Sequence, residues 1–349
     1  MIFLQNRMIN YFKNRKKNAL NIKTNKKYLY KGVYFYICNA NRNYWKKYNF
    51  IGNWITDVLF SRENQLKYKI KSILGFDLRI IRNDGTNAVG NQLYITRKGK
   101  IKVFDKEKKQ VVTICDEREA KIASLFQSNY IKFFPSSPFI EIDNENSMIV
   151  ERFLQEQYQW RKNYESVKET MIDVMNSLSL YVASEMKNAK IKYVNDFISA
   201  IISKTNDQDL LNFIYEIKTS IGNKDRLFFI PQHNDLVLSN VIRDLKGITV
   251  LDYEFYNENI FYYDSMTWII WEAVRYNHDS YLNDYLNGEY DNLFIALFNS
   301  SAMKFTPGKR ALYAIYYILA NINVHLDTSD NTNIASYNRI FQILKQKIK

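Results

Sequence analysis

The spacing of apolar residues changes twice along the chain, and these changes divide it into three parts. In residues 1–75, cationic residues are interleaved with aromatic ones, and apolar positions recur at helical spacing through Trp54, Val58, Leu59 and Leu66. This recurrence favours helices that cap a larger domain. The alternative is a nucleic-acid surface, because aromatic rings set among cations can stack on bases.

From residue 76 the pattern changes to short apolar runs separated by polar turns. One helix is predicted in DEREAKIASLF, where Asp116 stands at the N-cap position and Glu119 follows three residues later, as in a capping box. The remaining runs predict strands of a mostly antiparallel sheet: FDLRII, QLYIT, KIKVFD, QVVTIC, FIEI and SMIVERFL. Residues 76–154 are therefore expected to form a β-rich lobe.

Residues 155–349 return to helical spacing. One series, Val167, Met171, Val174 and Leu178, keeps the period of an amphipathic helix. Two short apolar strands, RLFFI and GITVLDY, interrupt the helical pattern. A β-rich small lobe followed by a larger helical lobe predicts an α+β fold. The two lobes would be joined near Glu151, with a cleft between them.

Composition and charge narrow the class of protein. The 349 residues are 46% hydrophobic and 24% charged, as in an ordinary globular protein. The net charge of +13 suits nucleic acid, an anionic membrane or a phosphate-bearing ligand, but an AT-rich genome would also enrich lysine. Two cysteines, Cys38 and Cys115, with three histidines exclude a disulfide framework and a cysteine-based zinc site.

The chain shows no sign of a membrane segment or an export signal. No apolar run reaches the ~18 residues of a membrane-spanning helix. The first residues, MIFLQNRMINYFKNRKKN, have no long apolar stretch before their charges, unlike a secretory signal. We therefore expect a cytoplasmic protein.

The segment PQHNDLVLSNVIRDLKGITVLDYE, residues 231–254, carries the strongest candidate chemistry. Asp235 follows a strand and can accept a proton from a hydroxyl nucleophile. Asn240, five residues later, can reach a metal ion on the same side. Asp252, at the end of the next strand, supplies the hard carboxylate that Mg²⁺ prefers. This spacing is typical of phosphoryl transfer, whereas any one of these residues alone would be read as a capping or strand-end acid.

The same segment resembles the aminoglycoside phosphotransferase and choline kinase superfamily, which are small-molecule kinases with a bilobal protein-kinase-like fold. The motif HND, in place of the commoner HGD, and the following LDYEFYNENIFYYD are most similar to the choline and ethanolamine kinase branch. The resemblance covers residues 76–285 and is specific at 233–264. It implies ATP and Mg²⁺ as cofactors and a hydroxyl group as the phosphate acceptor.

The resemblance also implies roles for individual residues. Asp235 matches the catalytic base, and His233 matches the histidine that supports the catalytic loop. Asn240 and Asp252 match the Mg²⁺ ligands, and Glu254 matches an acid that reaches a second metal ion.

In the small lobe the resemblance implies a lysine on a strand that anchors the phosphates and a glutamate on the helix that pairs with it. Lys102 and Glu119 fit these positions. The alternative for Lys102 is one solvated lysine among several, because the same stretch also contains Lys98, Lys100, Lys106, Lys108 and Lys109.

Two further contacts with ATP are expected. The loop NDGTNAVGN, with Gly85 and Gly90, would lie over the phosphates, although a plain hairpin turn has the same pattern. The backbone from Glu151 to Phe153 would meet the adenine.

The acceptor site is expected near SMTWIIWEAV. Asp264, just before this segment, matches an aspartate that braces the catalytic loop. Trp268, Trp271 and Glu272 would surround a cationic amino alcohol, because ring faces and an acid attract a quaternary ammonium. The alternative places both tryptophans in the core of the large lobe.

These patterns predict an ATP- and Mg²⁺-dependent kinase of the choline or ethanolamine kinase type. A sugar, a glycan precursor or an aminoglycoside is the alternative acceptor. A pseudokinase that binds phosphate without turnover is the non-enzymatic alternative, and nucleic-acid binding rests on composition alone. The predicted domains are residues 1–75, 76–154 and 155–349.

Overall fold

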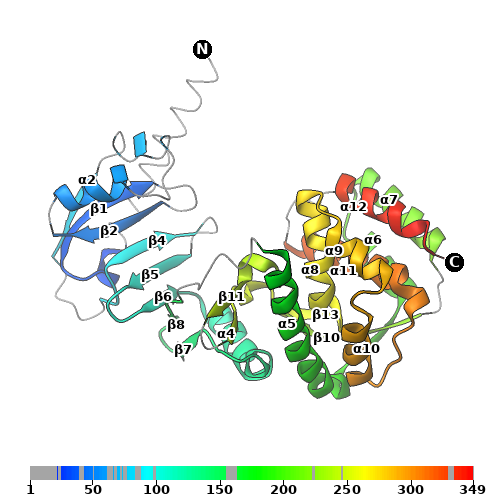
Figure 1. Ribbon diagram of the computed structural model, residues 1–349. Helices are drawn as coiled ribbons and strands as arrows, with labels where there is room; N and C mark the ends of the chain where they lie inside the picture. The colour runs from blue at the N-terminus through cyan, green and yellow to red at the C-terminus, as the bar shows by residue number, and fades with distance from the viewer. Residues whose placement is uncertain are drawn as a thin grey trace, which may run out of the picture. The chain divides into compact units, whose positions relative to one another are not determined.

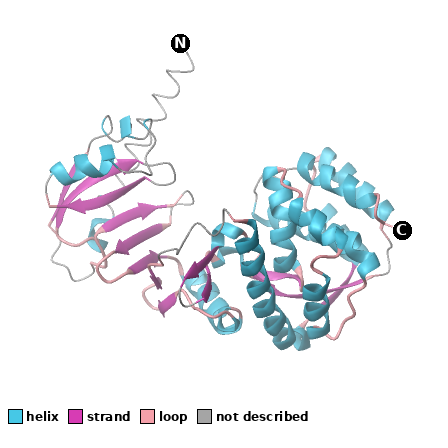
Figure 2. Cartoon of the chain, viewed as in Figure 1, coloured by secondary structure: helices cyan, strands magenta, loops and turns pink. Residues whose placement is uncertain are grey.

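The structure is a computed structural model that describes residues 22, 25–38, 43–49, 51–60, 66, 69–70, 73, 77–82, 88–96, 100–154, 163–221, 225–244, 247–328 and 334–348. The chain forms two compact units. Unit 1 consists of Met1–Ala123 and Pro138–Leu154, and unit 2 of Ser124–Ser137 and Gln155–Lys349. Strands dominate unit 1 and helices dominate unit 2 (Figure 2). The predicted α+β class, with a β-rich part followed by a mostly helical part, is confirmed.

Unit 1 contains an eight-stranded sheet in the order β3-β1-β2-β4-β5-β6-β8-β7 (Figure 1). Every neighbouring pair is antiparallel. The strands are β1 (Gly32–Cys38), β2 (Asn43–Tyr48), β3 (Leu78–Ile81), β4 (Gln92–Ile95), β5 (Ile101–Asp105), β6 (Gln110–Ile114), β7 (Phe139–Asp143) and β8 (Met148–Arg152).

Strands β1 and β2 lie where the sequence analysis expected helices. In GVYFYIC, Tyr34 and Tyr36 pack into one apolar cluster, whereas Phe35 and Ile37 pack into another. Alternate side chains of a strand point to opposite faces, so a run that is apolar at every position suits a strand covered on both sides. The aromatic residues of 32–38 and 43–48 therefore belong to the sheet itself, whereas the helical spacing at Trp54 and Val58 is confirmed by the helix Ile51–Phe60.

Helix α2 (Ile51–Phe60) covers one of these faces. The rings of Trp54 and Phe35 stack with centroids 5.8 Å apart, and the Trp54 indole N–H donates to the Tyr36 carbonyl at 3.1 Å. Val58 is buried in the same cluster, while Leu59 is 39% exposed. The helix is thus amphipathic, and its buried face holds the outer strands in place.

Helix α4 (Glu117–Asn129) begins in unit 1 and ends in unit 2. The Asp116 carboxylate accepts the Glu119 backbone N–H at 2.8 Å, which makes Asp116 the predicted N-cap. One free donor of the first helical turn is therefore satisfied without water.

Unit 2 is built mainly of helices around two small sheets. The three-stranded sheet has the order β13-β10-β9, and β11 and β12 form a hairpin. The strands are β9 (Lys190–Tyr193), β10 (Arg226–Gln232), β11 (Val241–Asp244), β12 (Gly247–Val250) and β13 (Asn257–Ile260). The helices are α5 (Tyr164–Glu185), α6 (Val194–Ile202), α7 (Gln208–Ser220), α8 (Tyr263–Tyr276), α9 (Ser280–Asn287), α10 (Asp291–Ser300), α11 (Arg310–Thr328) and α12 (Ile334–Lys345).

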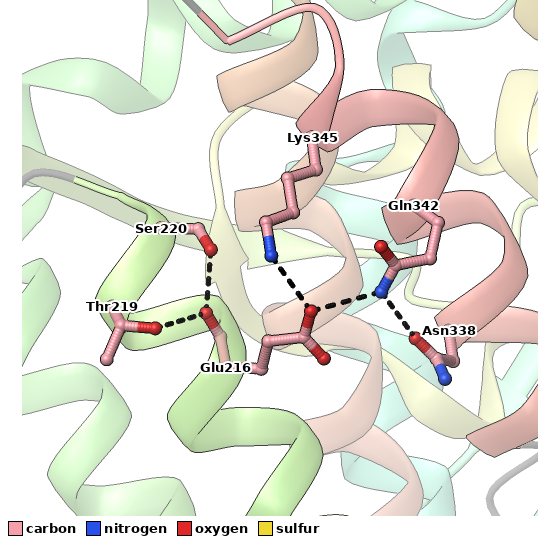
Figure 3. A network of polar contacts seen from close by, with 6 residues as sticks. All are labelled: Glu216, Thr219, Ser220, Asn338, Gln342 and Lys345. Carbon is pink, nitrogen blue, oxygen red and sulfur yellow. Dashed lines mark hydrogen bonds and ion pairs between the residues drawn. The ribbon is translucent and has the colours of Figure 1, made fainter.

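A surface network joins α7 to α12 (Figure 3). The Glu216 carboxylate accepts from the Gln342 amide and from the Lys345 ammonium, each at 3.1 Å. These contacts lower the pKa of Glu216, the Gln342 hydrogen bond more than the Lys345 one. Exposed pairs of this kind contribute little to the free energy of unfolding. The network therefore orients α12 relative to α7 and adds little to stability. Among the described residues, no helix combines the length and the apolar character needed to cross a bilayer.

Candidate functional site

The candidate site is built on the turn that follows β10 and on the β11–β12 hairpin, all within unit 2. Strand β10 ends at Gln232, and His233, Asn234 and Asp235 follow it directly. A short 3₁₀ turn, Leu238–Asn240, leads into β11. Because Val241 pairs with Val250 and the Leu251 N–H donates to the Asn240 carbonyl at 2.8 Å, Asn240 and Asp252 lie at the same open end of the hairpin.

Asp264 holds this turn in place. Its buried carboxylate accepts the backbone N–H of His233 at 2.7 Å and of Asn234 at 3.0 Å. The Tyr130 hydroxyl donates to it at 2.8 Å, and the Asp264 N–H donates to the Gln232 side chain at 3.1 Å. Burial raises the pKa of Asp264, and the donated hydrogen bonds oppose that rise by stabilising the carboxylate. One side chain thus ties α8 to the end of β10.

The His233 ring links the turn to the end of β12. Its Nδ1 accepts the Asp235 backbone N–H at 3.2 Å, so this nitrogen carries no proton. The proton therefore lies on Nε2, which donates to the Leu251 carbonyl at 2.7 Å. In this tautomer the His233 ring positions the backbone of Asp235 and leaves no ring nitrogen for a ligand.

Asn234 occupies the place of the glycine in the commoner HGD motif. Its φ is +65°, in the left-handed region that glycine and asparagine tolerate best. Its side-chain amide donates to the carbonyls of Phe255 and Asn257 at 2.8 and 2.9 Å, and its carbonyl accepts from Asn259 at 2.6 Å. The strained turn is therefore held by hydrogen bonds to the segment that precedes α8.

Asp235 and Asn240 lie side by side. The Asn240 amide donates to the Asp235 carboxylate at 2.9 Å and to the Asp235 backbone carbonyl at 2.8 Å. Asp252 is exposed and has a φ of +64°. Glu254 follows in the 3₁₀ turn Tyr253–Phe255 and is half-buried. The predicted base and the predicted metal ligands thus gather around the open end of one hairpin.

This set of side chains fits Mg²⁺ by its chemistry. All the candidate ligands are oxygen donors, and Mg²⁺ keeps several waters and needs only one or two protein carboxylates. Among the described residues there is no group of three or more His, Cys, Asp or Glu side chains that could hold a metal ion. The described residues therefore do not form a zinc-type site. A partly hydrated Mg²⁺ matches the amide of Asn240 and the carboxylates of Asp252 and Glu254.

A cavity of about 170 Å³ opens beside Asp235. It lies wholly within unit 2, and Trp271 of α8 and Phe255 supply its rings. The other lining residues are Asn234, Val237, Thr267, Asn321, Val324 and His325. The cavity is concave, small and mainly apolar, with the Asp235 carboxylate at its edge, which is the form of a small-ligand site.

The two other predicted acceptor residues do not line this cavity. Trp268 is 4% exposed and packs in the core of unit 2. Glu272 is half-buried, and burial raises its pKa while the nearby His278 opposes the rise. Successive helical residues are turned by ~100°, so Trp271 and Glu272 face different surroundings. The structure therefore brings only Trp271 to Asp235.

In unit 1, the partner of Glu119 is Lys100. The Lys100 ammonium lies 2.9 Å from the Glu119 carboxylate, and its side chain is 15% exposed. Lys102 is half-buried in β5, between Tyr94 and Thr113 of the neighbouring strands. The two lysines lie two residues apart and thus on the same face of the strand. Of the two, Lys100 contacts the first turn of α4, through Glu119.

Of the residues in unit 1 that were predicted to contact ATP, those that the structure describes make packing contacts or hydrogen bonds within the unit. Gly85 lies outside the described residues. Gly90 packs against β5 so closely that a Cβ there would lie 2.6 Å from the Phe104 carbonyl oxygen. The Phe153 N–H donates to the Lys109 carbonyl at 2.7 Å, and Glu151 is buried in β8. The Phe153 N–H is therefore already used within the sheet.

No protein-family model matches the chain, and no curated protein matches it. Among solved structures, it is similar to a choline/ethanolamine kinase family protein from Mesorhizobium loti, with 12% identity over 73% of this chain and 86% of that chain and a TM-score of 0.43. A choline kinase from Streptococcus pneumoniae has 13% identity, coverage of 71% and 89%, and a TM-score of 0.41. An amicoumacin kinase in complex with AMP-PNP, Ca²⁺ and Ami has 8% identity, coverage of 97% and 94%, and a TM-score of 0.41.

Every TM-score is below 0.5, so these similarities carry no argument about function, and the roles proposed below rest on the sequence motif and on the geometry of this chain.

Several of these contacts were not found from the sequence. Lys100 was named only among the lysines that surround Lys102, because helix–strand register is not visible in a run with alternating lysines. Phe255, Asn321 and His325 reach the cavity from segments far apart in the sequence, and no local motif marks them. Tyr130 binds Asp264 from 134 residues away.

We expect Asp264→Asn to destabilise unit 2. The substituted amide keeps the size but turns an N–H₂ group toward backbone N–H donors, so at least one donor stays unpaired. The free energy of unfolding, measured by chemical denaturation, should fall by about 1–3 kcal/mol. Glu289→Gln, an exposed carboxylate in the same unit, is the control. Equal stability of both variants and the wild type would contradict the bracing role.

Proposed function

We propose that this protein is an ATP- and Mg²⁺-dependent kinase that transfers the γ-phosphate to the hydroxyl of a small amino alcohol, choline or ethanolamine. The observation that supports this best is the position of Asp235. Its carboxylate is held by the Asn240 amide at the edge of a small cavity with aromatic walls. A carboxylate that is fixed beside a small cavity and near two candidate metal ligands suits phosphoryl transfer.

In this proposal Asp235 accepts the proton of the acceptor hydroxyl. The hydroxyl oxygen forms a bond to the γ-phosphorus as the bond to the bridging oxygen breaks, and ADP leaves. The hydrogen bonds from Asn240 orient the carboxylate, and Asp264 and His233 keep its backbone in place. Most of the rate enhancement then comes from positioning and from neutralisation of charge.

Asp252 and Asn240 would hold Mg²⁺, and Glu254 would reach a second ion. When bound, the metal neutralises phosphate charge and lowers the barrier to transfer. Because Asp252 is exposed at the hairpin end, its carboxylate is accessible to a hydrated ion.

The lining of the cavity favours an amino alcohol over a sugar or an aminoglycoside. The polar groups in its wall are largely engaged, since the Asn321 amide bonds the Tyr263 and Tyr317 hydroxyls and the Thr267 hydroxyl donates to the Tyr263 carbonyl. A polyol would find few partners there, whereas the Trp271 ring can face an ammonium group.

A panel of acceptors tests the proposal. ATP consumption should appear with choline or ethanolamine, should exceed that with glucose or kanamycin, and should stop when EDTA removes the metal. Asp235→Asn should lower kcat by about a hundredfold or more, because proton acceptance is lost, and should leave ATP affinity nearly unchanged.

Two results of this panel would overturn the proposal. Near-normal kcat in the Asp235→Asn variant would remove the base assignment. Nucleotide binding without turnover of any acceptor would favour the pseudokinase alternative.

Trp271 and Trp268 provide a matched pair on one helix. Trp271→Ala should raise KM for the amino alcohol about twofold to thirtyfold without changing KM for ATP, because only the ring over the ammonium is lost. Trp268→Phe should leave both KM values unchanged and lower the free energy of unfolding by about 1–3 kcal/mol, since its site is the core. The reverse assignment of effects would show that the cavity is not the acceptor site.

Lys100, rather than Lys102, is proposed to bind the ATP phosphates, because Lys100 forms the ion pair with Glu119. Lys100→Met should lower kcat/KM for ATP about tenfold to a hundredfold, the worth of a charge-assisted hydrogen bond. Lys102→Met serves as the control and should stay near wild type. The kcat/KM of Glu119→Gln should lie between those of the two lysine variants, because this change loosens the lysine without removing it. A larger loss of kcat/KM in Lys102→Met than in Lys100→Met would favour Lys102, the residue that the sequence predicted.

A further inference from the structure

The Asp235 cavity contains one titratable group that the proposed chemistry does not use, the imidazole of His325. This residue lines the cavity from α11, and the other walls come from the turn after β10, from Phe255 and from α8. His325, Asp235 and Trp271 are each half-buried, so part of each side chain is accessible to a ligand. A molecule that occupies the cavity therefore lies close to the imidazole as well as to the proposed base.

The face of α11 that carries His325 is fixed one helical turn earlier, at Asn321. The buried Asn321 amide donates to the Tyr263 hydroxyl of α8 at 2.5 Å, and its carbonyl accepts from the Tyr337 hydroxyl of α12. Residues four apart on a helix share a face, and both Asn321 and His325 line the cavity. The helix therefore cannot rotate the imidazole away without breaking buried hydrogen bonds.

Few charged groups face this imidazole. Among the described residues that line the cavity, Asp235 and His325 are the two that can carry a charge near neutral pH. On α8, Asp264 accepts hydrogen bonds from the backbone of the turn, and Glu272 lies outside the lining and interacts with His278. The acids of α8 that the structure describes are therefore directed to other partners.

The charged groups on the neighbouring helices are also paired. Asp327 stands two residues after His325, which is ~200° around α11, and it accepts from the Lys204 ammonium at 2.7 Å. On α12, Arg339 donates to both carboxylate oxygens of Asp279, at 2.6 and 2.8 Å. Of the described groups, His325 is thus the one whose ordinary titration near neutral pH would change the charge inside the cavity.

We propose that His325 determines the charge selectivity of the acceptor cavity. The neutral imidazole admits an ammonium group, and the protonated imidazole excludes it while still admitting a neutral alcohol. This inference rests on the proposed function, because it concerns the same cavity. Two like charges about 6 Å apart, at an effective dielectric constant of about 20, repel strongly enough to weaken binding by more than tenfold.

The test compares choline with 3,3-dimethylbutan-1-ol, in which a carbon atom replaces the charged nitrogen and the shape is kept. Calorimetry on the full chain with Mg·AMP-PNP gives the Kd of each at pH 8.5 and pH 5.5. The Kd of choline should rise about fivefold to tenfold at the lower pH, because about nine in ten imidazoles of ordinary pKa are then protonated. The Kd of the neutral alcohol should change less than about twofold.

Proton release gives a second readout. Choline and the proton oppose each other in this proposal, and such coupling is reciprocal. Choline binding near pH 6.5 should therefore release part of a proton, which is measured as a dependence of the binding heat on the ionisation enthalpy of the buffer. A histidine that only packs against the cavity would not produce this release.

Three variants assign the effect, and melting temperatures check that each is folded. His325→Gln removes the titration and should bind choline equally at both pH values, without proton release. His325→Lys introduces a cation that persists at both pH values and should weaken choline binding about tenfold or more at each, with the affinity for the neutral alcohol retained. The control His278→Gln changes an exposed histidine of the same unit and should behave as the wild type.

Two results would overturn the role of His325. These are a choline Kd that does not change with pH in the wild type, and a change with pH that persists in His325→Gln. In either case, choline binding and turnover at pH 8.5 would leave the proposed function intact. If choline fails to bind at both pH values, the proposed function and the role of His325 are both wrong.

Discussion

The position of every candidate group in unit 2 depends on one buried carboxylate, that of Asp264. Two consecutive backbone N–H groups, those of His233 and Asn234, point at it, and the Tyr130 hydroxyl adds a third donor. A buried charge is tolerated only when it is paired or fully hydrogen-bonded, so this arrangement leaves the turn few other conformations. Because Asp264 stands in the first turn of α8, the same contact sets the position of Trp271 relative to Asp235.

Aromatic packing supports the turn from the other side. The Phe126 ring meets the His233 ring edge-on at 5.5 Å and stacks with Tyr253 at 5.7 Å. Tyr130, four residues later, stacks with Phe126 at 5.0 Å. The last part of α4 is therefore packed against the turn that follows β10, which explains why residues 124–137 belong to unit 2 although the helix begins in unit 1.

The sequence was sufficient where function depends on local spacing. The apolar runs RLFFI and GITVLDY on either side of the motif allowed two strands to be predicted, and the structure has β10 and β12 there, whereas β11 was not predicted. The cap at Asp116 was also predictable, because a helix start is a local event.

Prediction was poorer where packing between distant segments decides the outcome. Strands β1 and β2 have an aromatic pattern that fits a helix or a doubly covered strand, and only the neighbouring strands settle which one forms. Whether Glu119 pairs with Lys100 or with Lys102 depends on how α4 lies on β5, which no periodicity reveals. Trp268 and Trp271 differ only in which face of α8 the core covers.

Two non-glycine residues with positive φ frame the candidate site, and they differ in what stabilises them. Asn234 offsets the strain through hydrogen bonds from its amide to the carbonyls of Phe255 and Asn257. Asp252 has a similar φ but an exposed carboxylate. Glycine would adopt this backbone at lower cost, and asparagine and aspartate are the other residues that visit it. Because strained backbone conformations gather at functional positions, the conformation of Asp252 agrees with its proposed role as a metal ligand.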